Sequence, residues 1–403
     1  MKIKGLSLKN IGPFRTAKLN FCVKDSTDVA PVTIITGMNG TGKSIVIDSI
    51  RTILEGTNLT SVRNIIADPT IFSIELDCEI DKVEHKLITR HLVGNQPNTA
   101  NLEVAKHFYF DTDYAGITDW IVDYWTSNVP TDSFTISNIS AIQHKNVLRG
   151  VLEGKKSNVE LTNFLCHVDY MRNSDIPDEK ELGNVVFETV KNIINRCLDN
   201  GEFKYIRRSE MMPIVEQNGR EVSFDKLSMG NIFLIEHMVM LLCKMYSICI
   251  LNHKSPQELT MVPGVLLIDE IENHLHPKWQ KSILTILRET FPKLQIILTT
   301  HSPFIVSSAT DARFYVCVSQ PGYSEVKDVT DVYENLPVEE VLLTDVFNVG
   351  PFNDQITTML AKRKKAYAEG DEKMAKEIEK QLFEINPQYF SYLEIPSFKS
   401  LQQ

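Results

Sequence analysis

A glycine-rich segment that ends in lysine and serine has the residue types needed to hold the phosphates of a nucleotide. Glycines let successive backbone N–H groups turn inward around a phosphate, and the helix that follows adds its positive end. Lys43 would reach the β- and γ-phosphates, and the Ser44 hydroxyl would be a ligand of Mg²⁺. The segment fits G-x-x-x-x-G-K-[ST] and predicts ATP contacts from Gly37, Asn39, Gly40, Thr41, Gly42, Lys43 and Ser44.

Two acidic residues end an apolar run, Val265-Leu266-Leu267-Ile268-Asp269-Glu270. Beside a bound nucleotide, Asp269 would hold Mg²⁺ through water, and Glu270 would polarise the attacking water as a general base. The alternative is a strand that simply meets solvent at two acids. The phosphate loop in the same chain favours the catalytic interpretation.

A histidine follows another buried strand, in Thr300-His301-Ser302-Pro303. Strand ends at the carboxyl edge of a parallel sheet gather at the ligand site. We therefore expect His301 to donate a hydrogen bond to the γ-phosphate region, the alternative being a cap or core residue.

The tetrapeptide Leu227-Ser228-Met229-Gly230 precedes a long apolar helix. Ser228 is well placed to cap that helix, and a helix N-terminus is a site for anions. The tetrapeptide alone is better interpreted as a simple helix cap. It gains a functional interpretation only together with the phosphate loop, the acid pair and the histidine elsewhere in the chain.

Alternating strands and helices must position these residues. We expect strands in residues 1–36, ending in a β-branched run between Pro31 and Gly37, and then a helix over 43–54. After Leu227 the expected order is a helix, a strand over 265–268, a helix over 278–289, a strand over 294–299, a short helix and a strand over 314–318. This order predicts an α/β fold with a mixed or parallel central sheet covered on both faces.

The remaining segments are expected to be an antiparallel β subdomain, a helical insertion and a helical tail. Residues 72–93 alternate as two strands with a turn near Asp81-Lys82, and Asn218-Gly219 predicts a hairpin over 204–225. Helices are expected over 116–125 and 178–198. We predict an ATPase N-lobe with the phosphate loop and antiparallel strands (1–110), a mainly helical insertion (111–203), an ATPase C-lobe (204–330) and a helical C-terminal region (331–403).

Composition and charge narrow the class of protein. The 403 residues include 42 Lys+Arg and 52 Asp+Glu, so the net charge of −10 does not favour general binding to nucleic acid. Seven cysteines without a CxxC pair predict reduced thiols in the cytoplasm. The first residues lack the apolar run of a secretory signal. Residues 232–251 are interrupted by Glu236, His237 and Lys244, which predicts a buried helix and no membrane span.

In their order, the phosphate loop, Leu-Ser-x-Gly, the acid-tipped strand and the following histidine resemble the ABC-type ATPases. The opening residues 3–14 are similar to the first strands of the SMC/RecF/OLD branch, and the likeness covers residues 1–60 and 220–320. The stretch LIDEIENHLHPKWQ at 267–280, followed by TTHSP at 299–303, looks very like the stand-alone ATPases of bacterial anti-phage systems. These include the Septu, retron-associated and PARIS ATPases and the ATPase half of OLD nucleases.

The resemblance implies a head-to-tail homodimer, or a higher homo-oligomer, with ATP and Mg²⁺ between subunits. Ser228 and Gly230 of one subunit would touch the γ-phosphate held by Lys43 of the other. ATP would close the dimer and hydrolysis would open it. Arg15 is expected to contact the nucleotide. The glutamine that approaches Mg²⁺ in this family has no clear pattern here; Gln143 is one candidate, and an exposed loop residue is the alternative.

Several features are absent. No sustained heptads lie between Ser44 and Leu227, so we expect no long coiled-coil arm. No acid-rich strand set of the Toprim nuclease type follows Asp269, which favours a separate effector, a nuclease or a toxin. Weaker candidates are metal ligation by His274 and His276 or by Asp111 and Asp113, the pair Cys166-His167, and the basic groups Lys362–Lys365 and Arg207-Arg208. We favour a helix entry for the two histidines, acidic turns for the two aspartates, a core pair for Cys166-His167 and solvated charges for Lys362–Lys365. The role of Arg207-Arg208 is left open.

The sequence thus favours a slow ATPase that acts as a nucleotide-gated sensor or scaffold in anti-phage defence and controls a separate effector. A RecF-like repair ATPase is the main alternative, and the net charge argues against it. A transporter nucleotide-binding subunit fits the segment 272–280 poorly. A non-hydrolysing binding module is disfavoured because Lys43, Asp269, Glu270 and His301 are all present.

Overall fold

The chain forms two compact units, Met1–Val341 and Leu342–Gln403, which are described separately. The computed structural model describes residues 1–55, 67–68, 71–93, 96–99, 118–344, 346–347 and 352–391. The first unit contains the residues singled out above as nucleotide contacts and catalytic groups.

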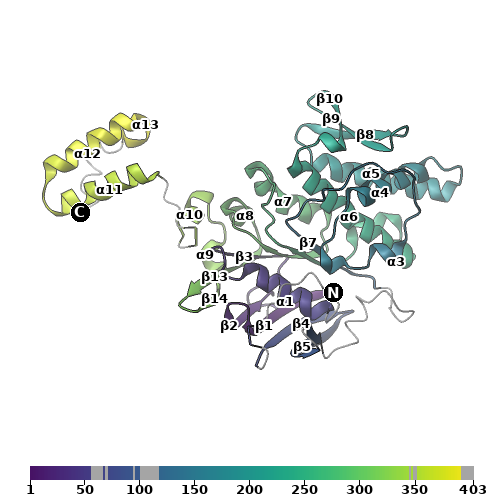
Figure 1. Ribbon diagram of the computed structural model, residues 1–403, viewed down its shortest axis with the longest axis horizontal. Coiled ribbons are helices and arrows are strands. Elements are labelled where there is room, and N and C mark those ends of the chain that lie inside the picture. The colour runs from purple at the N-terminus through teal and green to yellow at the C-terminus, as the bar shows by residue number, and fades with distance from the viewer. Residues whose placement is uncertain are drawn as a thin grey trace. The chain divides into compact units, whose positions relative to one another are not determined.

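A mixed sheet organises the first unit (Figure 1). Among the described residues it has eleven strands, in the order β6-β5-β4-β1-β2-β14-β13-β3-β12-β11-β7. Their bounds are β1 Lys2–Ile11, β2 Phe14–Asn20, β3 Val32–Gly37, β4 Ser73–Ile80, β5 Val83–Val93, β6 Gln96–Thr99, β7 Ile121–Trp125, β11 Gly264–Ile268, β12 Leu294–Thr299, β13 Ala312–Gln320 and β14 Tyr323–Asp328.

The half of the sheet that carries the site is parallel. Strands β7, β11, β12, β3 and β13 pair in parallel, and every residue of β3, β11 and β12 is buried. Buried, β-branched and leucine-rich strands are expected where helices cover both faces of a sheet. Parallel pairing also places the carboxyl ends of β3, β11 and β12 at one edge, so the residues that follow these strands meet there.

In the other half β1, β2, β4, β5 and β6 pair antiparallel, as predicted for residues 72–93, and β2 meets β14 in parallel. Strand β4 pairs with β5 across a two-residue turn at Asp81 and Lys82, both with positive φ (50° and 68°). Two positive φ angles define a type I′ turn, whose twist matches that of the flanking strands. The hairpin of β8 (Gly201–Arg207), β9 (Met212–Gln217) and β10 (Arg220–Ser223) forms a separate small sheet, with its predicted turn at Asn218 and Gly219.

Helices cover both faces of the parallel strands. Val265 and Leu267 of β11 share a core with Val46 and Ile50 of helix α1. Since side chains alternate along a strand, Leu266 points to the opposite face. The helices of this unit are α1 Lys43–Glu55, α3 His144–Val147, α4 Asn158–Arg172, α5 Pro177–Arg196, α6 Met229–Leu251, α7 Pro277–Thr290, α8 Pro303–Ser308, α9 Thr330–Tyr333 and α10 Val338–Leu343, the last extending into the second unit. Figure 1 shows α4, α5, α6 and α7 on one side of the parallel strands and α1 on the other.

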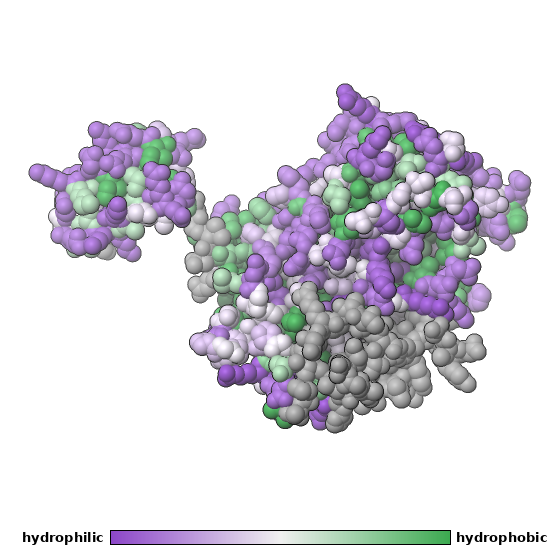
Figure 2. Space-filling view, viewed as in Figure 1, coloured by the Kyte–Doolittle hydropathy of each residue, from purple (hydrophilic) through white to green (hydrophobic). Residues whose placement is uncertain are grey.

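Helix α6 is the central core helix. It is long and apolar enough to cross a membrane, but 89% of its most apolar window is buried inside the protein. A helix that is apolar on all sides is a core helix when neighbours surround it. The predicted buried helix is therefore confirmed, and Figure 2 shows mainly hydrophilic side chains on the visible face, with apolar ones in small groups.

The predicted helix over 116–125 is wrong where the structure describes it. Residues Ile121–Trp125 form strand β7, all of it buried, next to β11. The run Ile-Val-Asp-Tyr-Trp is rich in β-branched and aromatic residues, and a short apolar run does not by itself distinguish a strand from a helix. The segment predicted as a mainly helical insertion thus contributes one strand to the central sheet.

The second unit is helical where it is described. It contains α11 (Asp354–Ala368), α12 (Glu372–Ile385) and α13 (Pro387–Phe390). Ile378, Leu382 and Phe390 form its small core. This agrees with the helical tail expected from the sequence.

Candidate active site

The phosphate loop connects β3 to α1, as its sequence predicts. Gly37, Gly40 and Gly42 have φ angles of 145°, 78° and 104°, and Lys43 is the first residue of α1. The Lys43 ammonium donates hydrogen bonds to the carbonyl oxygens of Gly37 and Met38, each at 3.0 Å. The lysine is therefore folded over its own loop, where a phosphate would take the place of these carbonyl acceptors.

The three glycines of the loop have different steric surroundings. A Cβ on Gly42 would lie 2.6 Å from Cζ of Phe14, and one on Gly37 would lie 2.4 Å from the carbonyl oxygen of Cys317. A Cβ on Gly40 would meet nothing within 4 Å. Gly40 thus faces open space, as a phosphate cradle requires, while Gly42 is pressed against the β1–β2 turn.

Three other predicted contacts lie in this loop or in the first turn of α1. Thr41 donates its hydroxyl hydrogen bond to the carbonyl oxygen of Met38 at 2.8 Å, which closes the loop on itself. Asn39 is exposed at the tip, and Ser44 is half-buried in the first turn of α1. Asn39 is therefore accessible, whereas Thr41 and Lys43 are buried in their hydrogen bonds to the loop backbone.

The acid pair lies between neighbouring strand ends. Asp269 Oδ1 accepts a hydrogen bond from Thr299 Oγ1 at 2.6 Å, and Thr299 Oγ1 accepts one from the backbone N–H of Glu270 at 2.8 Å. The N–H of Asp269 donates to the carbonyl oxygen of Trp125 on β7 at 3.0 Å. Strands β7, β11 and β12 together fix the Asp269 carboxylate.

Glu270 is held in an unusual conformation. Its φ of 55° lies in the left-handed region, which is uncommon for a residue other than glycine. Asn273 Nδ2 donates a hydrogen bond to Glu270 Oε2 at 2.8 Å. Strained backbone positions that neighbours enforce concentrate at functional sites, and this one turns Glu270 away from the strand direction of Asp269.

A second glutamate, which the sequence analysis did not single out, anchors the histidine. Glu272 Oε1 accepts the backbone N–H of His301 at 2.6 Å, and Glu272 Oε2 accepts the Thr300 hydroxyl at 2.7 Å. Burial raises the pKa of the Glu272 carboxyl, and the nearby Glu270 adds to the rise. The signal was present as a second acid two positions after Glu270, but strand ends are often acidic.

The charges of these groups interact. Burial lowers the pKa of Lys43, an effect opposed by the carboxylates of Glu272, Glu270 and Asp269. Burial, followed by the positive charge of Lys43, lowers the pKa of His301, so its imidazole is neutral at pH 7. One edge of the sheet thus brings together a lysine, three carboxylates and a neutral histidine.

Ser228 and Gly230 lie elsewhere in the chain. Ser228 caps α6, since its hydroxyl accepts the N–H of Asn231 at 3.2 Å. A Cβ on Gly230 would lie 2.5 Å from the carbonyl oxygen of His274, so α6 starts against the loop that follows Glu270. Within the described chain, Ser228 contacts Asn231 and Gly230 lies against the loop of His274. Neither contact is to the phosphate loop.

Arg15 and Gln143 are also placed. Exposed Arg15 stacks on Tyr323 of β14, 4.5 Å from the ring centroid, one residue after the Phe14 that packs on Gly42. Gln143 precedes α3 and lines a different cavity, discussed below. The residues that follow β7 beside Asp269 are Thr126 and Ser127, so Gln143 does not directly follow that strand.

The weaker metal candidates have structural roles where they are described. His276 caps α7 by accepting the N–H of Lys278, and His274 packs near Phe233. Buried Cys166 donates to the carbonyl oxygen of Met211 at 3.7 Å. In the described part of the chain no group of three or more His, Cys, Asp or Glu side chains is arranged to hold a metal. Asp111 and Asp113 lie outside the described residues.

The arginines of the two basic groups form ion pairs with acidic residues. Arg207 lies 3.4 Å from Glu210, and Arg208 lies 3.0 Å from Asp169. In the second unit, within the Lys362–Lys365 group, Arg363 pairs with Glu379 at 2.8 Å. These arginines therefore do not form unpaired basic patches.

Comparisons with known proteins agree with this geometry. Two family models match: one described as "AAA domain" over residues 5–167, and one described as "AAA domain, putative AbiEii toxin, Type IV TA system" over residues 136–307. The Smc head bound to the C-winged helix domain of ScpA superposes with a TM-score of 0.51 at 14% identity, covering 81% of this chain and 98% of that one. At this identity the likeness shows the fold alone.

Similar curated proteins come from bacterial systems. The Septu protein PtuA of Bacillus thuringiensis is 24% identical over 84% of this chain and 83% of its own length. The "Retron Vc95 probable ATPase" of Vibrio cholerae is 33% identical over 33% of this chain, and the "Retron Ec83 probable ATPase" of Escherichia coli is 25% identical over 54%. The matched regions span 24% and 40% of these two retron proteins.

In fold and site the chain resembles the ABC-type ATPases of the SMC/RecF/OLD branch. Within that branch it resembles the ATPases of the Septu and retron defence systems.

Proposed function

We propose that the protein binds and hydrolyses ATP as a homodimer or higher homo-oligomer and thereby controls a separate effector in anti-phage defence. The observation that carries this proposal is the arrangement at one sheet edge, where Lys43, Asp269 and Glu270 lie together. A phosphate loop that only stored a nucleotide would not need an acid held in a left-handed backbone conformation beside a fixed metal-binding carboxylate.

The residues divide the chemistry among them. The loop N–H groups and Lys43 bind the phosphates, and Glu270 accepts a proton from the attacking water. Ser44 and Asp269 would hold Mg²⁺, which supplies neutralisation of phosphate charge when bound. The donor set fits such an ion, because hydroxyl and carboxylate oxygens are its preferred ligands. His301 is neutral, so it donates a hydrogen bond to the γ-phosphate without adding a full charge.

A second subunit completes the site. Ser228 and Met229 are exposed at the start of the 23-residue helix α6, whose N-terminus is suited to an anion. Within the chain Ser228 contacts Asn231, and Gly230 contacts the His274 loop. We assign Ser228 and Gly230 to the γ-phosphate of the partner subunit, and Arg15 to the nucleotide held by its own chain.

Control of an effector in the cytoplasm is the biological part of the proposal. PtuA and the two retron proteins belong to named Septu and retron systems, and the described part of this chain contains no metal cluster of a nuclease. A DNA-loading role of the RecF type is less well supported, since Arg207, Arg208 and Arg363 pair with acids. An effector would be a nuclease or a toxin supplied by another chain.

Mixing two inactive variants tests the shared site. Lys43→Ala removes phosphate binding and Ser228→Ala removes the contact across the dimer, so each homodimer should hydrolyse little ATP. Random exchange places both defects in one site of a heterodimer and leaves the other intact. The mixture should therefore recover about a quarter of the wild-type rate. A mixture that stays at the rate of the separate variants contradicts a shared site.

The effector is tested by recovery of the tagged protein from its native host with ATP present. Mass spectrometry and native mass should find an oligomer with a stoichiometric second protein that has nuclease or toxin chemistry. A bare dimer that carries only DNA would support the repair function instead.

A further inference from the structure

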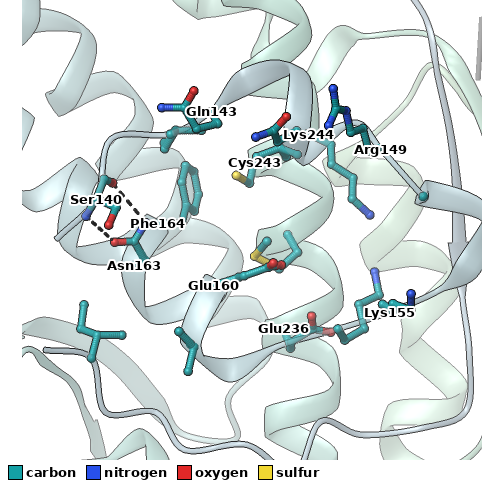
Figure 3. Close-up of a pocket in the computed structure, with 18 of the residues that line it drawn as sticks. Ser140, Gln143, Arg149, Lys155, Glu160, Asn163, Phe164, Glu236, Cys243 and Lys244 are labelled. Atoms are coloured by element: carbon teal, nitrogen blue, oxygen red, sulfur yellow. Dashed lines mark hydrogen bonds between the residues drawn. The ribbon is translucent and has the colours of Figure 1, made fainter. Parts of the chain in front are cut away.

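A separate cavity of about 760 Å³ lies between residues 135–156 and helices α4 and α6. Figure 3 shows Glu236 and Lys244 projecting from α6, with Glu160, Asn163 and Phe164 on α4. The phosphate loop and the acid pair are not among the residues that line it. Its volume is within the range of small-molecule sites, about 300–1,000 Å³.

The wall contains a buried lysine without a hydrogen-bond partner. The Lys156 side chain is 4% exposed, and its Nζ lies 3.8 Å from Asp123 Oδ2, beyond hydrogen-bond distance. Asp123 already accepts from Lys244 Nζ at 2.5 Å and from Trp125 Nε1 at 3.2 Å. An ammonium group has three N–H donors, so Lys156 brings unsatisfied donors to a carboxylate that already pairs with Lys244, and burial lowers the pKa of Lys156.

A buried glutamate faces the same space. Glu236 is fully buried, and neither of its carboxylate oxygens accepts a hydrogen bond. Its neighbour His237 lies 3.1 Å away, but His237 Nδ1 donates to the carbonyl oxygen of Phe233 at 2.8 Å. Burial raises the pKa of Glu236 to about 7, so near neutral pH this carboxyl is partly protonated and cannot fully balance Lys156 and Lys244.

Unpaired polar groups at such depth are costly, and most proteins satisfy them. An anion beside Lys156 would supply the missing acceptor. A hydrogen-bond donor beside Glu236 would supply the missing donor. The unmet requirements of this wall are thus those of a molecule with an anionic end and polar groups.

The rest of the lining suits a mononucleotide. Amide side chains at the rim include those of Gln143 and Asn146, and the buried Phe164 forms part of the wall. Arg149 lies at the mouth, where Lys155 pairs with Glu153. Amides can pair with the edge of a base, and lysine is a common ligand of phosphate.

The cavity is connected to the elements of the ATP site. Arg51 of α1, the helix that follows the phosphate loop, donates to the carbonyl oxygen of Leu152 at 2.8 Å, between wall residues Val151 and Glu153. Helix α6 begins at the Ser228 cap and carries Glu236 and Lys244. A molecule in the cavity would therefore contact segments attached to both halves of the shared ATP site.

We propose that this cavity is a second ligand site, which takes a phosphate monoester of mononucleotide size, with its phosphate on Lys156 and a donor group on Glu236. The proposal does not depend on ATP hydrolysis at the sheet edge. It also accounts for the two unpartnered buried groups, which the ATPase chemistry does not use.

Calorimetric titration of the full chain tests the site. Lys43→Ala is used as the background, to weaken nucleotide binding at the phosphate loop, and the probes are AMP, GMP, CMP, UMP and inorganic phosphate. At least one nucleotide should bind one per chain, more tightly than phosphate. Lys156→Met should weaken this binding by about tenfold or more, because a charged hydrogen bond is lost. Lys145→Met, an exposed lysine on α3, is the matched control and should leave the affinity unchanged.

Hydrogen exchange provides a test that does not depend on the Lys156 variant folding. In the Lys43→Ala protein, the bound nucleotide should protect amides in residues 135–156 and in the facing part of α6. Binding that protects only residues 37–46, equal affinity in a folded Lys156→Met protein, or no binding by any probe at millimolar concentration would overturn the proposal and leave a purely structural charge network.

Discussion

The backbone N–H of His301 donates a hydrogen bond to Glu272 Oε1, with an N···O distance of 2.6 Å. Glu272 Oε2 also accepts the hydroxyl of Thr300, so one carboxylate holds the end of β12 to the loop after β11. This carboxylate thus adds a connection between the Glu270 loop and His301, beside the hydrogen bond from the Glu270 N–H to Thr299 Oγ1. The carboxylate itself is buried and faces protein donors, which makes Glu272 a positioning residue.

Substitutions of Glu272 should distinguish an effect on the position of His301 from an effect on the stability of the protein. Glu272→Ala removes both acceptors, and we expect ATP hydrolysis to fall by about 10–100-fold while ATP affinity changes little. Glu272→Gln keeps an acceptor for the His301 N–H and should recover most of the rate. Rates and thermal midpoints are measured for both variants. Equal loss of activity in both, in proportion to lost stability, would show a structural role only.

Glu270→Gln should stop hydrolysis and keep ATP. The amide retains the size of the side chain but does not accept a proton, so the rate should fall by at least about 100-fold. ATP binding by calorimetry should remain, and native mass should show more closed dimer. Asn273→Ala is the control for geometry, since it removes only the hydrogen bond to Glu270. Unimpaired hydrolysis in Glu270→Gln would rule out the role as base.

Two alanine substitutions in the phosphate loop should destabilise the protein by different amounts. Gly40→Ala and Gly42→Ala both place a side chain at positive φ, 78° and 104°, at a cost of about 1 kcal/mol or more each. Gly42→Ala also drives a Cβ to within 2.6 Å of Phe14, whereas Gly40→Ala meets open space. Urea unfolding should therefore show the larger loss for Gly42→Ala. A larger loss for Gly40→Ala would contradict the packing of the β1–β2 turn on the loop.

Much of this site follows from the sequence, because its motifs are local. The phosphate loop lies between a strand and a helix as its pattern requires, and Asp269 and His301 follow adjacent buried strands. Parallel pairing then brings their ends together without further information. The turns at Asp81-Lys82 and Asn218-Gly219 were equally local, since Asp81, Asn218 and Gly219 are residue types that tolerate positive φ.

The missed features depend on contacts between distant segments. Glu272 became recognisable only when β12 placed Thr300 and His301 over it. Strand β7 was taken for a helix because its apolar run has no clear period, and its partner β11 lies more than a hundred residues away. Lys156 lacks a partner only because Lys244 and Trp125 occupy Asp123, which a one-dimensional pattern does not reveal.

Gly230→Ala should destabilise the protein although alanine favours helices. In an exposed helix this change would stabilise by up to about 1 kcal/mol. Here the added Cβ would lie 2.5 Å from the carbonyl oxygen of His274, a backbone atom, so α6 or the loop after Glu270 must move. Met229→Ala, at a half-exposed neighbour, is the control and should have little effect on urea unfolding. A stabilised Gly230→Ala protein would mean that the helix start is not packed on this loop.

Glu236→Gln should stabilise the protein more at high pH than at low pH. The folded pKa of Glu236 is about 7, above the ordinary value of 4.5, so its folded form is favoured while protonated and is penalised as pH rises through 7. The amide cannot ionise, and the variant should gain about 2 kcal/mol in unfolding free energy at pH 8.5 relative to pH 5.5. The lowered pKa of His237 affects both proteins and cancels in the difference. Urea unfolding at the two pH values measures this difference, with the exposed Glu181→Gln on α5 as control; equal gains at both would show that Glu236 is charged in the folded protein throughout.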